Sequence, residues 1–145
     1  TAAAETKPAY RSNISSDAPW EPVIGYSRAV RVMDHVYVAG TTAANEEGKP
    51  IGGNDPYQQA KYAISKIARA LNSAGAGLED VVRTRVLVTN IDHWKEVARA
   101  HQEVFGPIQP ACTLVAVSAF VERDLLVEIE AEAVIGCGRS KDDKR

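Results

Sequence analysis

The chain has 145 residues, enough for one domain with a hydrophobic core, and its 45% hydrophobic and 25% charged residues are ordinary for a soluble globular protein. A net charge of −2 gives no basic footprint for nucleic acid, and no apolar run approaches the roughly 20 residues of a membrane helix. The N-terminus also lacks the basic and then apolar pattern of a signal peptide. We therefore expect a cytoplasmic enzyme or binding protein with neither a nucleic-acid nor a membrane partner.

Changes in composition at both ends indicate one domain between two irregular segments. Residues 1–21 are polar and interrupted by prolines, which predicts an N-terminal arm. Residues 137–145, "CGRSKDDKR", predict a flexible C-terminal tail. Residues 22–136 contain neither a repeat nor a low-complexity linker, so we expect a single domain there.

The first half of this domain predicts a hairpin followed by a helix. The hairpin joins Arg28–Val32 and Val36–Ala39, two short runs rich in β-branched residues. After a glycine-rich loop, Asp55 is a good N-cap, Pro56 suits the first helical position, and Gln58 can complete a capping box. Apolar residues then recur at helical spacing, and the glycines of "AGAG" end the helix near residue 73.

The second half predicts a strand, a second helix and two further strands. The strand is Val82–Val88, and Asp92 can cap the helix after it. The apolar stripe of that helix consists of Trp94, Val97, Ala98, His101 and Phe105. "CTLVAVS" and "LLVEIEAEAVI" are the last strands. The order β-β-α-β-α-β-β predicts an α+β fold, with about five strands in a single sheet and both helices on one face.

Three glutamates in the last strand, Glu128, Glu130 and Glu132, share one face because side chains alternate along a strand. Their carboxylates lie about 7 Å apart, and the apolar residues between them face the helices. One interpretation is a solvated acidic stripe matched by Arg83 and Arg85. The other is that one glutamate lines a pocket, where it positions a water or moves a proton.

Other reactive residues give weaker signals. The three histidines lack the spacing of metal ligands, so we expect no metal site. His101 lies on the apolar stripe, as a partly buried histidine with a satisfied partner would. Cys112 and Cys137 are expected to be free thiols, and Cys112 alone is best explained as a small buried hydrophobe. No glycine-rich phosphate loop is present.

Four segments together resemble the Rid family, the YjgF-like reactive-intermediate deaminases: "PVIGYSRAVRVMDHVYVAG", "EDVVRTRVLVTNIDHWKEV", "FGPIQPACTLVAV" and "LLVEIEAEAV". The resemblance covers Pro22 to Ile135 and implies a chorismate-mutase-like fold. It also implies a homotrimer in which three sheets face inward as a central barrel, with clefts between subunits. Typical members hydrolyse small 2-imino acids or their enamine tautomers to 2-keto acids and ammonia, without a metal or organic cofactor.

The resemblance also implies roles for individual residues. The glutamate that orients the attacking water matches Glu128, and a tyrosine that lines the cleft matches Tyr26. Backbone N–H groups that contribute to substrate binding match Gly40 and Thr41.

Three positions depart from the typical pattern, and each loses a polar group. Typical members carry an arginine after a Pro-Ala pair, and its planar fork binds the substrate carboxylate. Cys112 stands there in this chain, Ala39 replaces a serine, and Ala98 replaces an asparagine. Losing a charge-assisted pair of roughly 1.5–3 kcal/mol weakens carboxylate binding by one to two orders of magnitude. We therefore expect a less charged or larger substrate, unless an arginine such as Arg28 or Arg123 compensates.

The leading hypothesis is a Rid-type hydrolase of an imine, enamine or related C–N compound, with Glu128, Tyr26 and Cys112 as catalytic candidates. The substrate-binding candidates are Ala39, Gly40, Thr41, Ala98 and His101. In one variant Cys112 is a nucleophile or thiol acid, which requires a depressed pKa, and His101 could approach it in the fold. The alternative is a non-catalytic trimeric protein that binds or senses a small molecule. RNA cleavage is disfavoured by the acidic balance.

Overall fold

The computed structural model describes residues 10–138. In these residues the chain forms six strands: β1 (Arg11–Ile14), β2 (Ala29–Val32), β3 (His35–Thr42), β4 (Val81–Val88), β5 (Ala111–Ala116) and β6 (Val127–Val134). The helices are α1 (Trp20–Ile24), α2 (Pro56–Ser73) and α3 (Trp94–Phe105), with the 3₁₀ turns η1 (Leu78–Asp80) and η2 (Ile91–His93).

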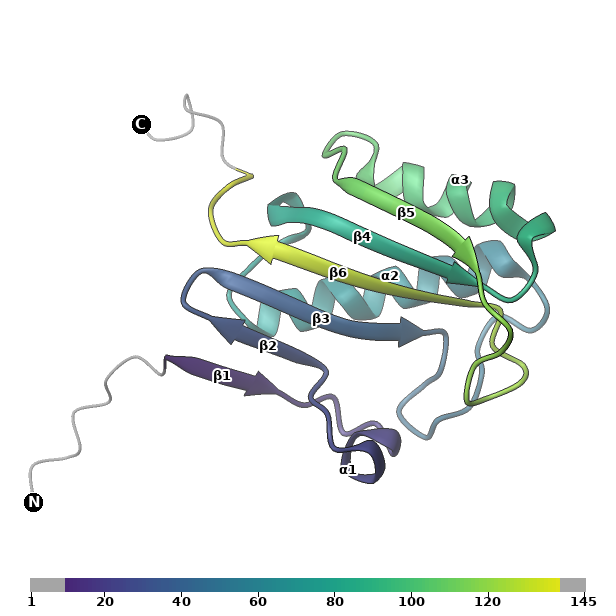
Figure 1. The fold of residues 1–145 in the computed structure, drawn as a ribbon, viewed down its shortest axis with the longest axis horizontal. Coiled ribbons are helices and arrows are strands. Elements are labelled where there is room, and N and C mark those ends of the chain that lie inside the picture. Colours follow the sequence, from purple (N-terminus) through teal and green to yellow (C-terminus); the bar gives the residue numbers. More distant parts are fainter. Residues whose placement is uncertain (1–9, 139–145) are drawn as a thin grey trace, which may run out of the picture.

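All strands belong to one sheet with the order β1-β2-β3-β6-β4-β5 (Figure 1). Neighbouring strands are antiparallel except β4 and β5, which are parallel because α3 forms the crossover between them. Helices α2 and α3 cover one face, and no helix of residues 10–138 covers the opposite face (Figure 1). The predicted α+β architecture, with both long helices on one face, is therefore confirmed.

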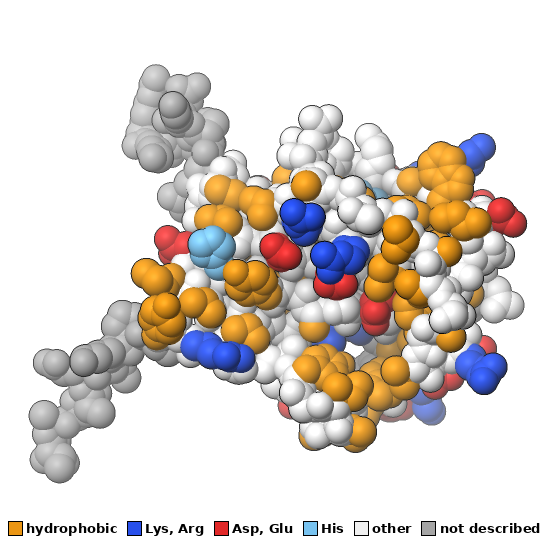
Figure 2. Space-filling model, in the orientation of Figure 1, with side chains coloured by type: hydrophobic (Ala, Val, Ile, Leu, Met, Phe, Trp, Pro, Cys, Tyr) orange, Lys and Arg blue, Asp and Glu red, His pale blue; other side chains and the backbone are white. Residues whose placement is uncertain are grey.

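Successive side chains of the central strand β6 project alternately toward the two faces of the sheet. Its burial alternates without interruption from Val127 to Val134: Val127, Ile129, Ala131 and Ala133 are buried, and the three glutamates are half-buried. Glu130 forms an ion pair of 3.1 Å with Arg85, and Glu132 lies opposite Arg83 in the register. In Figure 2, basic and acidic side chains adjoin over the middle of this face, with hydrophobic ones on either side. The interpretation as an acidic stripe matched by arginines is confirmed for Glu130.

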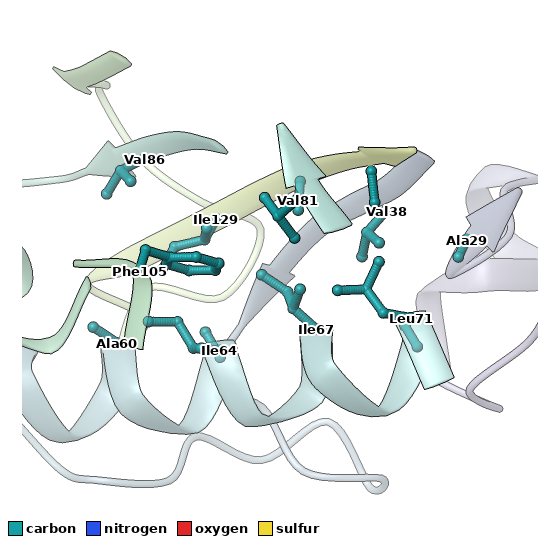
Figure 3. Packing of buried hydrophobic residues seen from close by; sticks show 14 of the residues in the cluster. Ala29, Val38, Ala60, Ile64, Ile67, Leu71, Val81, Val86, Phe105 and Ile129 are labelled. Atoms are coloured by element: carbon teal, nitrogen blue, oxygen red, sulfur yellow. The ribbon is translucent and has the colours of Figure 1, made fainter. Parts of the chain in front are cut away.

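The core fills the space between α2 and the sheet. Ile64, Ile67 and Leu71 project from α2 toward the strands, and Phe105 of α3 packs among them (Figure 3). Each such side chain contributes roughly 1.5–3 kcal/mol when fully buried. As predicted, Asp55 caps the helix: its carboxylate accepts the N–H groups of the second and third helical residues at 3.0 and 3.2 Å. The helix ends at the predicted position.

The expected irregular arm was wrong for the described part of residues 1–21. Residues Arg11–Ile14 form the edge strand β1, paired with β2 from Arg11 opposite Val32 to Ile14 opposite Ala29. Its sequence "RSNI" shows no hydrophobic alternation, because an edge strand is held mainly by backbone hydrogen bonds. The short helix α1 then begins at Trp20. Residues 1–9 and 139–145, which include most of the predicted tail, lie outside the described residues.

The predicted N-cap of the second helix was also wrong. The side chain of Asn90, not Asp92, accepts a backbone N–H, that of Asp92 itself, at 2.9 Å. This bond starts η2, and α3 begins only at Trp94. Asn90, two positions earlier, satisfies one free N–H group at the start of η2, so Asp92 lies inside the turn.

Candidate active site

A cavity of about 330 Å³ lies at the end of β3. There α1, the loop after β3 and the loop between β5 and β6 lie side by side (Figure 1). Its polar lining includes Tyr26, Arg28, Asn45, Lys66 and Glu128. The apolar part of the wall includes Trp20, Ile24, Phe120, Val121 and Leu125. The cavity thus combines ionisable groups with an apolar surface, as small-molecule sites commonly do.

Glu128 reaches this cavity from the open face of β6, and Gly40 makes room for it. A Cβ atom at Gly40 would lie 2.7 Å from the carboxylate carbon of Glu128 and 2.9 and 3.0 Å from its oxygens. The register between β3 and β6 shifts between Val38 and Thr41, so Gly40 occupies an irregular position. Glycine at this position lets the Glu128 side chain approach the backbone closely without displacement.

The surroundings of Glu128 raise the pKa of its carboxyl group. Burial raises the pKa of this carboxyl, and the charge of Glu130 raises it further, whereas the charge of Arg28 lowers it. Among residues 10–138, the carboxylate accepts no hydrogen bond and forms no ion pair. A half-buried carboxylate of raised pKa with free lone pairs is suited to take a proton from a water molecule.

Arg28 connects several residues of the site through hydrogen bonds. This side chain is only 5% exposed. Its Nη1 donates to the Gly40 carbonyl at 2.9 Å and to Thr41 Oγ1 at 2.8 Å, and its Nη2 donates to Tyr26 Oη at 3.2 Å. The Nε of Arg28 is buried and has no partner within the described residues. Arg28 therefore positions Tyr26 through a direct contact.

Lys66 is a second cation in the cavity wall. It projects from α2, and its Nζ donates to the carbonyls of Thr42 and Ala44 at 2.9 and 2.8 Å. Burial, with smaller contributions from the charges of Arg28 and Arg69, lowers the pKa of Lys66 to about 8. Sequence analysis did not single out this lysine. One signal was available, because position 66 lies one helical turn from Ala63 and Ala70, both of which are buried.

The structure brings together four of the predicted site residues: Tyr26, Ala39, Gly40 and Glu128 all line the cavity. Thr41 lies just behind them. It is fully buried, accepts a hydrogen bond from Arg28 and donates one to the Ala39 carbonyl at 2.7 Å.

The remaining predicted residues lie elsewhere in the chain. Cys112 on β5 pairs with Thr84 in a parallel register, so its side chain shares the helix-covered face with Thr84. Glu128 projects from the opposite face, and β4 separates the two strands. One chain alone therefore does not place Cys112 beside Glu128.

His101 and Ala98 lie on α3, outside the Glu128 cavity. The Nε2 of His101 is 2.8 Å from Thr84 Oγ1, and its ring centroid lies 4.6 Å from that of Phe105 with the two planes tilted by 39°. Burial lowers the pKa of His101. The predicted satisfied, partly buried histidine is confirmed. Of the arginines considered as compensation, Arg28 is in the cavity, and Arg123 is exposed outside it.

Within residues 10–138, no group of three or more His, Cys, Asp or Glu side chains is arranged to hold a metal ion. No helix in this range combines the length and apolarity needed to span a bilayer.

Comparison with known proteins identifies the family. Residues 16–135 match the family described as endoribonuclease L-PSP. An uncharacterized protein of Streptomyces coelicolor is 40% identical over 123 residues, covering 85% of this chain and 91% of that protein. The 2-iminobutanoate/2-iminopropanoate deaminase of Mus musculus is 30% identical over 111 residues, covering 77% of this chain and 82% of the deaminase. The crystal structure of a YjgF/YER057c/UK114 family member from Mycobacterium tuberculosis superposes with a TM-score of 0.78 at 45% identity, covering 86% of this chain and 99% of that one. These matches confirm the resemblance seen in the sequence motifs, and the chain belongs to the endoribonuclease L-PSP family, also called the YjgF/RutC/Rid family.

Proposed function

We propose that this protein is a Rid-type hydrolase that deaminates an imine, an enamine or a related C–N compound, with Glu128 as the base that orients the attacking water. The observation that carries this proposal is the carboxylate of Glu128, half-buried in a cavity, raised in pKa and without an internal partner. The mouse relative that is named a 2-iminobutanoate/2-iminopropanoate deaminase supports the same reaction class.

In the proposed reaction, one water molecule is consumed and one ammonia molecule is released. Glu128 accepts a proton from water as the oxygen attacks the imine carbon, and it returns this proton to the nitrogen, which forms a neutral carbinolamine. Glu128 then takes the hydroxyl proton and delivers it to the nitrogen as the C–N bond breaks. A carbonyl compound and ammonia leave, and Glu128 is again ionised. Tyr26 already accepts a hydrogen bond from Arg28, so its own hydroxyl hydrogen is free to orient the substrate.

We also propose a homotrimer with the reaction cleft between subunits. Its support is the separation of the predicted site residues into two groups within one chain. A cleft between chains would join the Glu128 cavity of one subunit to the Cys112 edge of its neighbour. Cys112 would then line the pocket, together with Ala98 and His101.

The alternative is a binding or regulatory protein that retains the cavity without turnover. The observation favouring it is the loss of polar groups at Cys112, Ala39 and Ala98. Binding of a metabolite without any release of ammonia would distinguish this function from that of a hydrolase.

The test is ammonia release from freshly generated imines, with and without a carboxylate, measured against a blank without protein. Glu128→Gln removes the base with little change in shape and should lower kcat by at least roughly 100-fold. Glu132→Gln is the matched control, because Glu132 lies on the same face of the same strand but outside the cavity. Unchanged turnover in Glu128→Gln would refute the mechanism. If the wild-type protein released ammonia from none of these imines, the result would favour a binding protein.

A further inference from the structure

We propose that Arg28 and Lys66 together bind the carboxylate of a monoanionic substrate, whose apolar side chain lies against the wall containing Trp20 and Phe120. This inference rests on the proposed function and names its substrate class: 2-imino acids with a large apolar side chain. The pair would bind the substrate carboxylate in place of the arginine that typical members carry at the position of Cys112. Arg28 and Lys66 lie in a different part of the fold from that position.

The cavity has a net positive charge that one bound anion would neutralise. Arg28 and Lys66 contribute two positive charges, and Glu128 contributes one negative charge when it is ionised. Within residues 10–138, neither cation forms an ion pair with a carboxylate. Buried charge is unfavourable without a counter-charge, so a single carboxylate would neutralise the surplus.

The two cations also retain unused hydrogen-bond donors. Lys66 Nζ has three donors and uses two of them on the carbonyls of Thr42 and Ala44. Arg28 Nη2 uses one of its two N–H groups on Tyr26, and Arg28 Nε is buried without a partner. Arg28 is 95% buried, since only 5% of its surface is exposed, and it lines the same cavity as Lys66. The donors left for a ligand are therefore one N–H of Lys66 Nζ and one N–H of Arg28 Nη2.

The rest of the wall indicates the kind of side chain that accompanies the carboxylate. Trp20 and Phe120 are half-buried, and Leu125 is buried beneath them in a small hydrophobic cluster. Ile24 and Val121 are 62% and 76% exposed, which leaves apolar surface for a ligand to cover. A branched aliphatic or aromatic side chain would cover this surface, and a methyl group would leave most of it in water.

Protonation of Lys66 adds a pH signature to this binding. The charged groups that act on its ammonium are Arg28, Arg69 and Glu21. Its pKa of about 8 means that the positive charge declines as the pH rises through that value. Carboxylate binding should therefore weaken above about pH 8, whereas an uncharged ligand should bind equally on both sides of it.

The test is calorimetric binding of the reaction's carbonyl products. The probes are 4-methyl-2-oxopentanoate, phenylpyruvate and pyruvate, with 4-methyl-2-pentanone as the uncharged analogue. Lys66→Gln keeps a donor but removes the charge, and should weaken binding of the larger oxo acids roughly 10- to 100-fold without changing that of the ketone. Lys66→Arg should restore most of the affinity. Lys61→Gln is the control, because Lys61 also lies on α2 but does not line the cavity, and its ammonium pairs with Glu103 at 3.2 Å.

Three results would overturn the inference: equal weakening of acid and ketone, an unchanged affinity in Lys66→Gln, or binding of pyruvate as tight as that of the larger acids. The same variants separate this inference from the proposed function. In the imine assay, Lys66→Gln should raise KM for carboxylated substrates only, whereas Glu128→Gln should lower kcat without weakening the binding of oxo acids. Retained turnover in Glu128→Gln with weakened binding in Lys66→Gln would refute the mechanism and support the carboxylate site.

Discussion

The close contact between Gly40 and Glu128 predicts that one added methyl group will disable the site. In Gly40→Ala, the new Cβ would lie 2.7 Å from the carboxylate carbon of Glu128. The backbone itself accepts alanine, because Gly40 does not adopt a left-handed conformation. The strain therefore falls on the Glu128 side chain, whose carboxylate end can move.

The size of the effect follows from the distance. Ordinary contact begins at 3.4 Å, so the carboxylate must retreat by about 0.7 Å. A misplacement of about 1 Å at a reacting centre costs on the order of 100-fold in rate, so we expect kcat to fall roughly 10- to 100-fold. The free energy of unfolding should fall by only about 1 kcal/mol, since a side-chain end yields more easily than a packed core.

Ammonia release and urea unfolding of Gly40→Ala measure the two quantities separately. The double variant Gly40→Ala/Glu128→Asp provides the control. Its shorter carboxylate relieves the overlap, so the free energy of unfolding should return toward that of Glu128→Asp alone while activity stays low. A Gly40→Ala protein with wild-type kcat would refute the assignment of Glu128 as the base.

Three further predictions test the electrostatics, the assembly and the fold. Glu130→Gln removes a like charge that raises the pKa of Glu128, so the acid limb of the pH profile of kcat/KM should move to lower pH; a shift to higher pH would contradict this assignment. Both cysteines are exposed in the single chain, but the proposed trimer shields Cys112. Alkylation followed by mass spectrometry should label Cys137 faster than Cys112, and equal rates would argue against the cleft between subunits. Asp80 is buried and its carboxylate accepts the N–H groups of three glycines, so Asp80→Ala should lower the free energy of unfolding by about 2–3 kcal/mol in urea. An unchanged urea midpoint would show that these bonds contribute little.

Elements with strong local signals were predictable from the sequence. Helix α2 combines the N-cap Asp55, a proline at its first position and an apolar stripe at helical spacing, and each signal points to the same start. Strand β6 alternates strictly, so both its faces and the projection of Glu128 toward the open side could be assigned. The glycine at position 40 followed only from family resemblance, and its steric reason required the structure.

Features that depend on distant partners were not predictable. Strand β1 exists because β2 offers an unpaired edge, and its own sequence carries no sign of this. Lys66 is an ordinary helix residue until the carbonyls of Thr42 and Ala44 approach it from the loop after β3. Cys112 and Glu128 were expected in one pocket. Their side chains project from opposite faces of the sheet, and β4 lies between their strands, so one chain does not bring them together.

The alternation of apolar residues and glutamates in β6 also disfavours incorrect strand pairing. A slip of one residue between β6 and its neighbours would turn Glu128, Glu130 and Glu132 toward the side chains of α2. Burying unpaired carboxylates there would cost several kcal/mol for each ion, far more than a misaligned sheet could recover. Glu128, the candidate base, therefore also disfavours mispaired sheets together with its two neighbouring glutamates. A variant that replaced all three with apolar residues would lose this discrimination and become prone to mispaired, aggregating sheets.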